Sequence, residues 1–275
     1  EEAVGLSRSV RRPLGVVPTL GALQDGHLSL ARRARQENRT AGATIFVNPM
    51  QFGPNEDLES YPRDLDRDLE LLDGMGMDFA FVPRVEEVYT AESCTLVEVR
   101  ALTNKLEGAS RPGHFQGVCT VVLKLFNILG PDRAYFGQKD GQQWRIIQRM
   151  ATDLNTGVEV VVCPTVREPD GLALSSRNNY LNTEERRSAT VLYNALCLAQ
   201  KANSAGENSA DKIRKQMSEL IGTQPSARID YISIADSETL EELMTIDRPA
   251  LVSLAVHIGE ARLIDNITLP NANAN

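Results

Sequence analysis

Short apolar runs alternate with amphipathic helical patterns through the first half of the chain. The runs that are typical of buried strands are residues 14–17, 44–47, 79–82, 134–136 and 158–163. Helical periodicity occupies the intervals between them, most clearly over residues 28–34, 64–72, 115–129 and 142–154. Strands that are joined through helices return in the same direction, so the alternation predicts an α/β fold with a doubly wound parallel sheet and helices on both faces.

The pattern changes after about residue 164. Residues 183–203 and 209–221 have helical periodicity, and residues 229–234, 251–256 and 262–267 have the composition of strands. Asn182 and Thr183 are suited to cap the first of these helices, with Glu185 in its first turn. We therefore expect a first domain over residues 1–166 and a smaller α+β C-terminal domain over residues 167–275.

Composition excludes several classes of protein. The 275 residues carry 29 Lys and Arg against 37 Asp and Glu, a net charge of −8, which disfavours binding to a nucleic-acid backbone. No apolar run approaches the roughly 18 residues of a transmembrane helix, and the first residues lack a basic-then-apolar secretion signal. The four cysteines are widely spaced, without zinc or thioredoxin-like spacing. We expect reduced thiols, a cytoplasmic location, and neither a nucleic-acid nor a membrane partner.

Polar residues that suit anion binding follow several predicted strands. The glycine-rich segment 18–26 leads into a helix, where backbone N–H groups and His27 could bind a phosphate. Lys139 lies in another strand-to-helix loop, beside Asp140, which could hold Mg²⁺ through water or cap the helix. A tight turn capped by a histidine would leave the same first pattern. Ligands bind at the carboxyl ends of strands in such sheets, but the spacing of the segment 18–26 alone favours the capped turn.

Neutral amides and hydroxyls follow other elements. Asn48 and Gln51 come directly after a strand and could bind a hydroxyl and a carboxylate without adding charge, although these residues alone favour a structural turn around Pro49. Ser175, Ser176 and Arg177 could clamp a triphosphate, or simply belong to a polar loop. Arg111 and His114 precede a helix and could line the same cleft, without an assignable role, or could equally belong to a solvated loop.

Five motifs in order resemble the pantothenate synthetase family of HIGH-type nucleotidyltransferases. They are P-T-L-G-A-L-Q-D-G-H from Pro18, F-V-N-P-M-Q-F from Phe46, R-P-G-H-F-Q-G-V from Arg111, F-G-Q-K-D-G-Q-Q from Phe136 and D-G-L-A-L-S-S-R-N-N-Y-L from Asp170. A weaker likeness continues through residues 259–266. Two positions depart from the family pattern: Leu20 replaces its usual Met, and Gln24 replaces the first His of its phosphate-binding loop.

The resemblance implies a Rossmann-like first domain and a C-terminal domain that closes over an ATP site, in a homodimer. It implies that the carboxylate of (R)-pantoate attacks ATP, with Mg²⁺, and that β-alanine then displaces AMP to give pantothenate. His27, Lys139 and Arg177 would stabilise charge, and Asn48, Gln51 and Gln143 would bind pantoate. The residues expected around ATP are Leu20, Gly21, Ala22, Leu23, Gln24, Asp25, Gly26, His27, Gly137, Gln138, Lys139, Asp140, Val166, Leu174, Ser175, Ser176 and Arg177.

Two rival interpretations stay open at this point. A different HIGH-type nucleotidyltransferase would share the phosphate-binding residues, although neutral amides suit a small hydroxy acid better than a mononucleotide. A catalytically impaired paralogue would bind nucleotide alone, and Gln24 favours it, because an amide can donate a hydrogen bond but cannot become cationic. Losing one charge-stabilising donor typically costs about 10²–10³ in rate, so we expect an active but slow enzyme.

Overall fold

The structure, a computed structural model, describes residues 2–54, 56 and 58–270. It divides into two compact units. The first comprises Glu1–Gly137 and Gln142–Pro164, and the second comprises Gln138–Gly141 and Thr165–Asn275. The short segment Gln138–Gly141 therefore belongs with the C-terminal part of the chain, although its sequence neighbours on both sides belong to the first unit.

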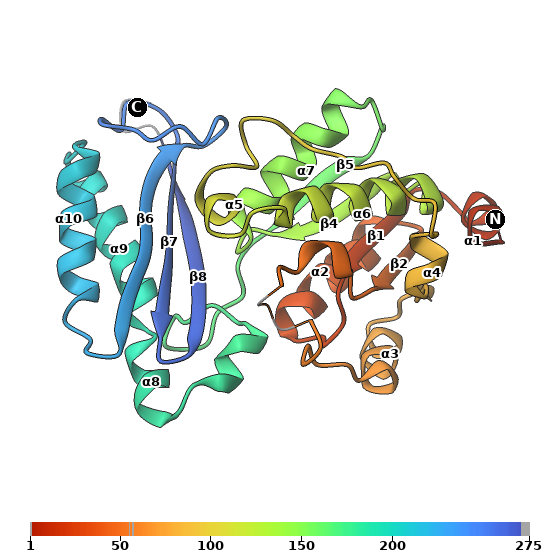
Figure 1. Ribbon diagram of the computed structural model, residues 1–275, viewed down its shortest axis with the longest axis horizontal. Coiled ribbons are helices and arrows are strands. Elements are labelled where there is room, and N and C mark those ends of the chain that lie inside the picture. Colours follow the sequence, from red (N-terminus) through yellow and green to blue (C-terminus); the bar gives the residue numbers. More distant parts are fainter. Residues whose placement is uncertain (1, 55, 57, 271–275) are drawn as a thin grey trace. The chain divides into compact units, whose positions relative to one another are not determined.

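The first unit is built on a five-stranded parallel sheet of order β3-β2-β1-β4-β5. Figure 1 labels β1, β2, β4 and β5 of this sheet. Its strands are β1 (Leu14–Thr19), β2 (Thr40–Ile45), β3 (Phe79–Phe81), β4 (Arg133–Gly137) and β5 (Glu159–Cys163). The chain leaves β1 toward β2 on one side, while β4 lies on the other side. The carboxyl ends of β1 and β4 therefore mark the switch point of the sheet, where ligands bind in folds of this kind.

Helices cover both faces of this sheet. They are α1 (Glu2–Ser9), α2 (Asp25–Glu37), α3 (Leu65–Gly74), α4 (Val85–Val88), α5 (Leu106–Ser110), α6 (His114–Leu129) and α7 (Gly141–Asp153), with the 3₁₀ turn η1 (Pro49–Gln51). Val17 packs with α2 and α3 on one face, whereas Leu14 and Val16 pack with Leu129 of α6 on the other. The predicted doubly wound sheet is confirmed. No helix in the described part of the chain has the length and apolarity that a membrane span requires.

The second strand lies earlier than its apolar run predicted. The expectation of residues 44–47 was wrong, because β2 covers Thr40–Ile45 and begins in small residues that carry no apolar signal. The close approach of Phe79 requires the glycine among these residues: a Cβ on Gly42 would lie 2.2 Å from its ring. Phe46 lies beyond the strand, although its N–H still donates to the carbonyl of Thr19.

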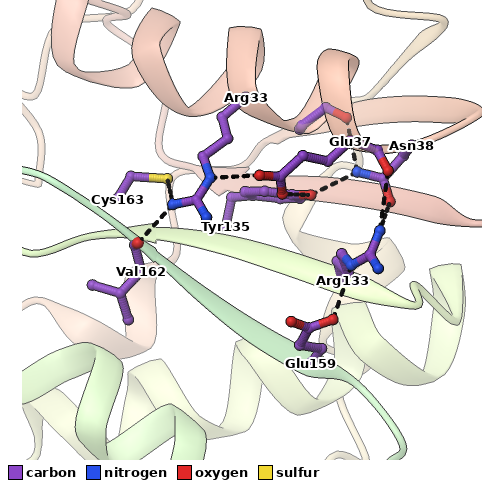
Figure 2. Close-up of polar contacts among 9 residues, drawn as sticks. Arg33, Glu37, Asn38, Arg133, Tyr135, Glu159, Val162 and Cys163 are labelled. Atoms are coloured by element: carbon purple, nitrogen blue, oxygen red, sulfur yellow. Dashed lines mark hydrogen bonds and ion pairs between the residues drawn. The ribbon is translucent and has the colours of Figure 1, made fainter.

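A polar network fixes the C-terminal end of α2 against the sheet (Figure 2). Arg33 donates to Glu37 at 2.9 Å and to the carbonyl of Val162 at 2.9 Å. Tyr135, which is fully buried, donates to Glu37 at 2.9 Å and accepts from Asn38 at 2.7 Å. Because α2 carries His27 at its other end, the network holds the helix from which that imidazole projects.

The second unit packs helices on an antiparallel sheet of order β6-β7-β8. Its elements are η2 (Ser176–Tyr180), α8 (Thr183–Ser188), α9 (Val191–Ser204), α10 (Ala210–Ile221), β6 (Ala227–Asp236), β7 (Ala250–Ile258) and β8 (Ala261–Leu269). Figure 1 shows α9 and α10 running beside each other along the sheet. Their apolar faces meet the alternate residues Val252, Leu254 and Val256 of β7 in one core.

The predicted single helix over residues 183–203 is two helices. Asn182 caps α8 as expected, with its side chain accepting from the N–H groups of Glu184 and Glu185. The helix then breaks at Ala189 and Thr190, where the ψ values of −22° and −18° are typical of a 3₁₀ turn. The N–H of Thr190 bonds to the carbonyl of Arg187 and that of Leu192 to the carbonyl of Ala189, and these i to i+3 bonds tighten the chain between α8 and α9.

Candidate active site

The loop after β1 is held in a left-handed conformation by one buried carboxylate. Gly21 and Ala22 have φ values of +87° and +51°. Asp68 of α3, only 1% exposed, accepts hydrogen bonds from the N–H groups of Ala22 and Leu23, both at 2.8 Å. A Cβ on Gly21 would lie 2.9 Å from Oδ2 of Asp68, so glycine is required there. This contact determines the backbone path of the predicted phosphate-binding loop.

His27 is the third residue of α2, and its tautomer follows from its partner. The N–H of Gln24 donates to Nδ1 of His27 at 3.2 Å. Because Nδ1 accepts this bond, the proton of the neutral ring lies on Nε2, which is then the donor atom. The first turn of the helix carries a partial positive charge, which favours an anion at the same end. Gln24 thus orients His27 through its backbone, which any residue with a backbone N–H would provide at this position.

Asn48 and Gln51 lie together, but they have different environments. Asn48 is fully buried, and its Nδ2 donates to the carbonyl of Gly117 and to Oε1 of Gln51, both at 3.1 Å. Its Oδ1 accepts from the N–H of Met50 and, at 2.9 Å, from the hydroxyl of Tyr89. Burial raises the pKa of Tyr89 to about 12, so this hydroxyl stays protonated and can donate. The side-chain amide of Asn48 thus forms all these hydrogen bonds with other groups of the protein itself.

The network determines which end of the Gln51 amide is left without a partner among the described residues. A backbone carbonyl and a backbone N–H bond to opposite ends of Asn48 and so fix its orientation. Its Nδ2 must then face the oxygen of Gln51, which leaves Nε2 of Gln51 without a partner among the described residues. Gln51 consequently presents an amide donor, the group that would bind a carboxylate or a hydroxyl.

A neutral histidine supports Gln51 from the other side. His114 bonds through Nδ1 to the carbonyl of Gln51 at 2.8 Å, and its Nε2 lies 3.1 Å from Nη1 of Arg111. Burial and the adjacent Arg111 charge lower the pKa of His114 to about 4. Arg111 also forms a bidentate ion pair with Glu56, with both N–O distances 2.6 Å. The structure thus gives Arg111 and His114 a supporting position that the sequence left unassigned.

Gln142 and Gln143, adjacent residues of α7, also differ in whether their side-chain amides bond inside the protein. Gln142 is buried, and its amide accepts from the N–H of Glu107 and donates to the carbonyls of Leu102 and Lys105. The side chain of Gln143 is partly exposed and has no hydrogen-bond partner among the described residues. Gln143 therefore keeps its donors and acceptor, whereas those of Gln142 are used inside the protein.

In the second unit, the segments around Lys139 and Ser175 carry the remaining expected ligand-binding residues. Oγ of Ser175 accepts the N–H of Arg177 at 3.3 Å and begins η2. The N–H of Leu174 donates to the carbonyl of Val166 at 3.0 Å, which closes the loop between them. Lys139, Asp140 and Ser176 are partly exposed. Within the residues that the structure describes, no three His, Cys, Asp or Glu side chains converge as metal ligands.

Comparison with known proteins decides the family. The family model described as pantoate-beta-alanine ligase matches residues 2–268. The chain belongs to this family. It is 58% identical over 255 residues to the pantothenate synthetase of Roseiflexus sp. strain RS-1, covering 93% of this chain and 92% of that protein. It is 55% identical to the pantothenate synthetase of Herpetosiphon aurantiacus, covering 98% of each chain.

Solved structures of the family have the same fold. The crystal structure of the pantothenate synthetase from Thermus thermophilus superposes with a TM-score of 0.92 at 48% identity, covering 96% of each chain. The pantoate-beta-alanine ligase from Francisella tularensis, solved with beta-gamma ATP and beta-alanine, has a TM-score of 0.79 at 34% identity, covering 97% of this chain and 94% of that one. The predicted family and fold are thereby confirmed.

Membership of the pantoate-beta-alanine ligase family was predictable from the motifs, but several supporting residues were not. Asp68 lies in a run of charged residues that is typical of an exposed helix, and Tyr89 belongs to none of the five motifs. Both form hydrogen bonds with residues far along the chain: Asp68 is 46 positions from Ala22, and Tyr89 is 41 positions from Asn48. No local pattern reports such distant contacts.

Proposed function

We propose that the protein is an ATP-dependent ligase that joins (R)-pantoate to β-alanine and releases AMP and pyrophosphate. The family match over residues 2–268 carries this proposal. The unbonded amide donor of Gln51 suits the acid substrate, and the ligase from Francisella tularensis was solved with beta-gamma ATP and beta-alanine. The described geometry gives no specific reason to prefer another nucleotidyltransferase or an inactive paralogue.

The proposed chemistry needs no covalent bond to the protein. A pantoate carboxylate oxygen attacks the α-phosphorus of ATP, the bond to the β-phosphate oxygen breaks, and pyrophosphate leaves. The amine of β-alanine then attacks the acyl carbon of pantoyl adenylate, the acyl C–O bond breaks, and AMP departs as the amine nitrogen loses a proton. The protein contributes alignment and stabilisation of the charge that develops on the leaving groups.

The roles of the side chains follow from their charge. Nε2–H of His27 donates to the phosphates, and Lys139 and Arg177 neutralise charge on the leaving pyrophosphate. Ser175 and Ser176 contribute hydroxyl groups, and the remaining residues expected around ATP enclose the nucleotide. Gln51 and Gln143 orient pantoate through neutral amides, because a cation at this place would pair with the attacking carboxylate and weaken it as a nucleophile. Asn48 acts through Gln51, since its own amide has only internal partners.

Asp140 is the residue that we propose for Mg²⁺. Its side chain is partly exposed and has no hydrogen-bond partner among the described residues, so the alternative role as a helix cap has no hydrogen bond to support it. A lone carboxylate fits this ion, since Mg²⁺ in nucleotide sites is usually held by one or two carboxylates, water and the phosphates themselves. When bound, Mg²⁺ would neutralise phosphate charge, and Asp140 would hold it from the protein side.

We further propose a cytoplasmic homodimer. Residues 1–166 would bind pantoate and part of ATP, and residues 167–275 would close over the nucleotide.

All four cysteines are free, and burial raises the pKa of Cys119 to about 12, which suits a reducing compartment without thiol chemistry. Light scattering of the purified chain tests the dimer, because a monomer at micromolar concentration would contradict it.

Omitting each substrate in turn tests the function. Pyrophosphate release should require ATP and pantoate, whereas AMP and pantothenate should appear only when β-alanine is also present. Chelation of Mg²⁺ should abolish both signals, and adding the ion back should restore them. Pyrophosphate release without pantoate, or ATP binding without any release, would show that the proposed reaction is wrong.

A further inference from the structure

Asn266 of β8 makes three side-chain hydrogen bonds with the segment that carries Lys139. Its Nδ2 donates to the carbonyl of Gln138 at 3.0 Å and to that of Lys139 at 2.7 Å. Its Oδ1 accepts from Nε2 of Gln138 at 2.7 Å. The side chain is only 3% exposed, so water does not compete freely for these bonds. One asparagine thus holds both of the peptide groups that flank Lys139.

The backbone of the same segment leaves little room for a side chain at residue 141. A Cβ on Gly141 would lie 3.0 Å from Cγ, Nδ2 and Oδ1 of Asn266. The glycine therefore permits the amide to lie directly against the chain after Lys139. These contacts also explain why Gln138–Gly141 groups with the C-terminal part of the chain rather than with its sequence neighbours.

The preceding residue of β8 holds the other expected ATP-binding segment. Asp265 forms a bidentate ion pair with Arg167, with distances of 2.6 and 3.0 Å, and the Arg167 guanidinium stacks on Tyr193 of α9 at 4.3 Å. Asp265 pairs with Leu254, which faces the helices, so Asn266 faces the opposite side of the sheet. Asp265 and Asn266, adjacent residues of the edge strand β8, thus hold the segment of Arg167 and the segment of Lys139 against opposite faces of the sheet.

Electrostatics agrees with this placement. Burial raises the pKa of Asp265, while the charges of Arg167 and Lys139 act in the opposite direction. The charges of both Arg167 and Lys139, one in each segment, therefore act on the carboxylate of Asp265.

We propose that Asn266 is a positioning residue for Lys139 in the ligase reaction. It sets the backbone from which the ammonium projects, relative to β8, the strand that also anchors Arg167 and the segment leading to Arg177. A misplacement of about 1 Å can cost about 100-fold in rate, which makes such a frame consequential. The inference rests on the proposed function, because it concerns the lysine expected to bind the phosphates of ATP.

Kinetics of the full chain test this inference. Asn266→Ala removes all three side-chain bonds, and we expect kcat/KM for ATP to fall about 100-fold while the dissociation constant for pantoate, measured by calorimetry, changes less than about twofold. Asn266→Asp keeps the volume but faces two carbonyls without a donor, and it should behave similarly. Asn203→Ala, at a buried asparagine of α9, is the matched control and should keep kcat/KM for ATP within about twofold.

A double-mutant cycle separates positioning from simple loss of stability. Gly141→Ala pushes its new methyl group against Asn266, so it should lower kcat/KM for ATP in the wild-type background. In the Asn266→Ala background the obstructing amide is gone, and the same substitution should have little further effect. Equal effects of Gly141→Ala in both backgrounds would overturn the inference.

The outcomes distinguish this inference from the proposed function. Wild-type activity together with unchanged ATP kinetics in folded Asn266→Ala overturns the positioning role alone. Wild-type protein that neither ligates nor binds ATP overturns both. If Asn266→Ala does not fold, the cycle is run with Asn266→Ser, which keeps one donor and should retain more activity than Asn266→Asp.

Discussion

Nδ2 of Asn48 lies 3.1 Å from Oε1 of Gln51, and this contact decides which end of the Gln51 amide is left without a partner among the described residues. Asn48 is itself fixed by a backbone carbonyl and a backbone N–H, so the donor end of Gln51 is imposed from inside the protein. A flexible amide becomes an oriented donor without carrying charge.

Replacement of Asn48 by alanine should weaken pantoate recognition. Gln51 would lose the partner of its oxygen and sample both amide orientations, and a lost hydrogen bond of about 1–1.5 kcal/mol corresponds to roughly tenfold. We expect KM for pantoate to rise by about that factor, with KM for ATP nearly unchanged. Tyr89→Phe is the matched control, because it removes one donor to Asn48 and leaves the contact with Gln51; it should have the smaller effect.

Replacement of Asp68 by asparagine should disturb the loop that leads to His27. Only one oxygen would remain to accept the N–H groups of Ala22 and Leu23, and the new NH₂ group would face a donor. We expect the free energy of unfolding to fall by about 1–3 kcal/mol, and kcat/KM for ATP to fall as well. Urea titration and initial rates measure the two effects. Asp66→Asn, at an exposed position of the same helix, should leave both unchanged.

Restoration of a histidine at position 24 should accelerate the first step. The backbone N–H of Gln24 already orients His27, so Gln24→His adds a donor without disturbing that contact. A charge-stabilising donor is worth about 10²–10³ in rate, of which the amide supplies a part. Single-turnover release of pyrophosphate should therefore be faster in Gln24→His than in wild type, and slower in Gln24→Ala. An unchanged or lower rate in Gln24→His would show that this position does not stabilise charge.

The pKa of His114 makes a contribution to stability that depends on pH. Because folding lowers this pKa from 6.5 to about 4, the unfolded chain binds a proton between these values while the native ring stays neutral. Folded stability is therefore lost as pH falls through this window and is regained as pH rises. From pH 7 to pH 5 the contribution amounts to at most about 2 kcal/mol.

Urea unfolding of wild type and His114→Gln at the two pH values isolates this contribution. Wild type should lose more free energy of unfolding than the variant, because other titrating groups, including His257, are common to both. Equal losses in the two proteins would mean that His114 titrates normally in the folded state.

The structure departs from sequence prediction where small residues or backbone breaks carry the information. β2 begins at Thr40, in residues without an apolar signal, because Gly42 must admit the ring of Phe79. The helix that was predicted to be continuous breaks at Ala189, although both of its halves are helical in composition. Periodicity reports burial along one element, but it does not report the shape of the neighbour against which that element packs.

The sequence by itself determined the alternation of strands and helices, the strand-end motifs and the family. Tertiary structure alone decided which amides bond to other residues and which keep an unbonded group. Asn48 and Gln142 bond inside the protein, whereas Nε2 of Gln51 and the side chain of Gln143 have no partner among the described residues. The physical reason is that an amide has the same donors and acceptors wherever it lies. Its role depends on the groups that meet it, and those groups come from distant parts of the chain, as Asn266 meets Lys139 across 127 residues.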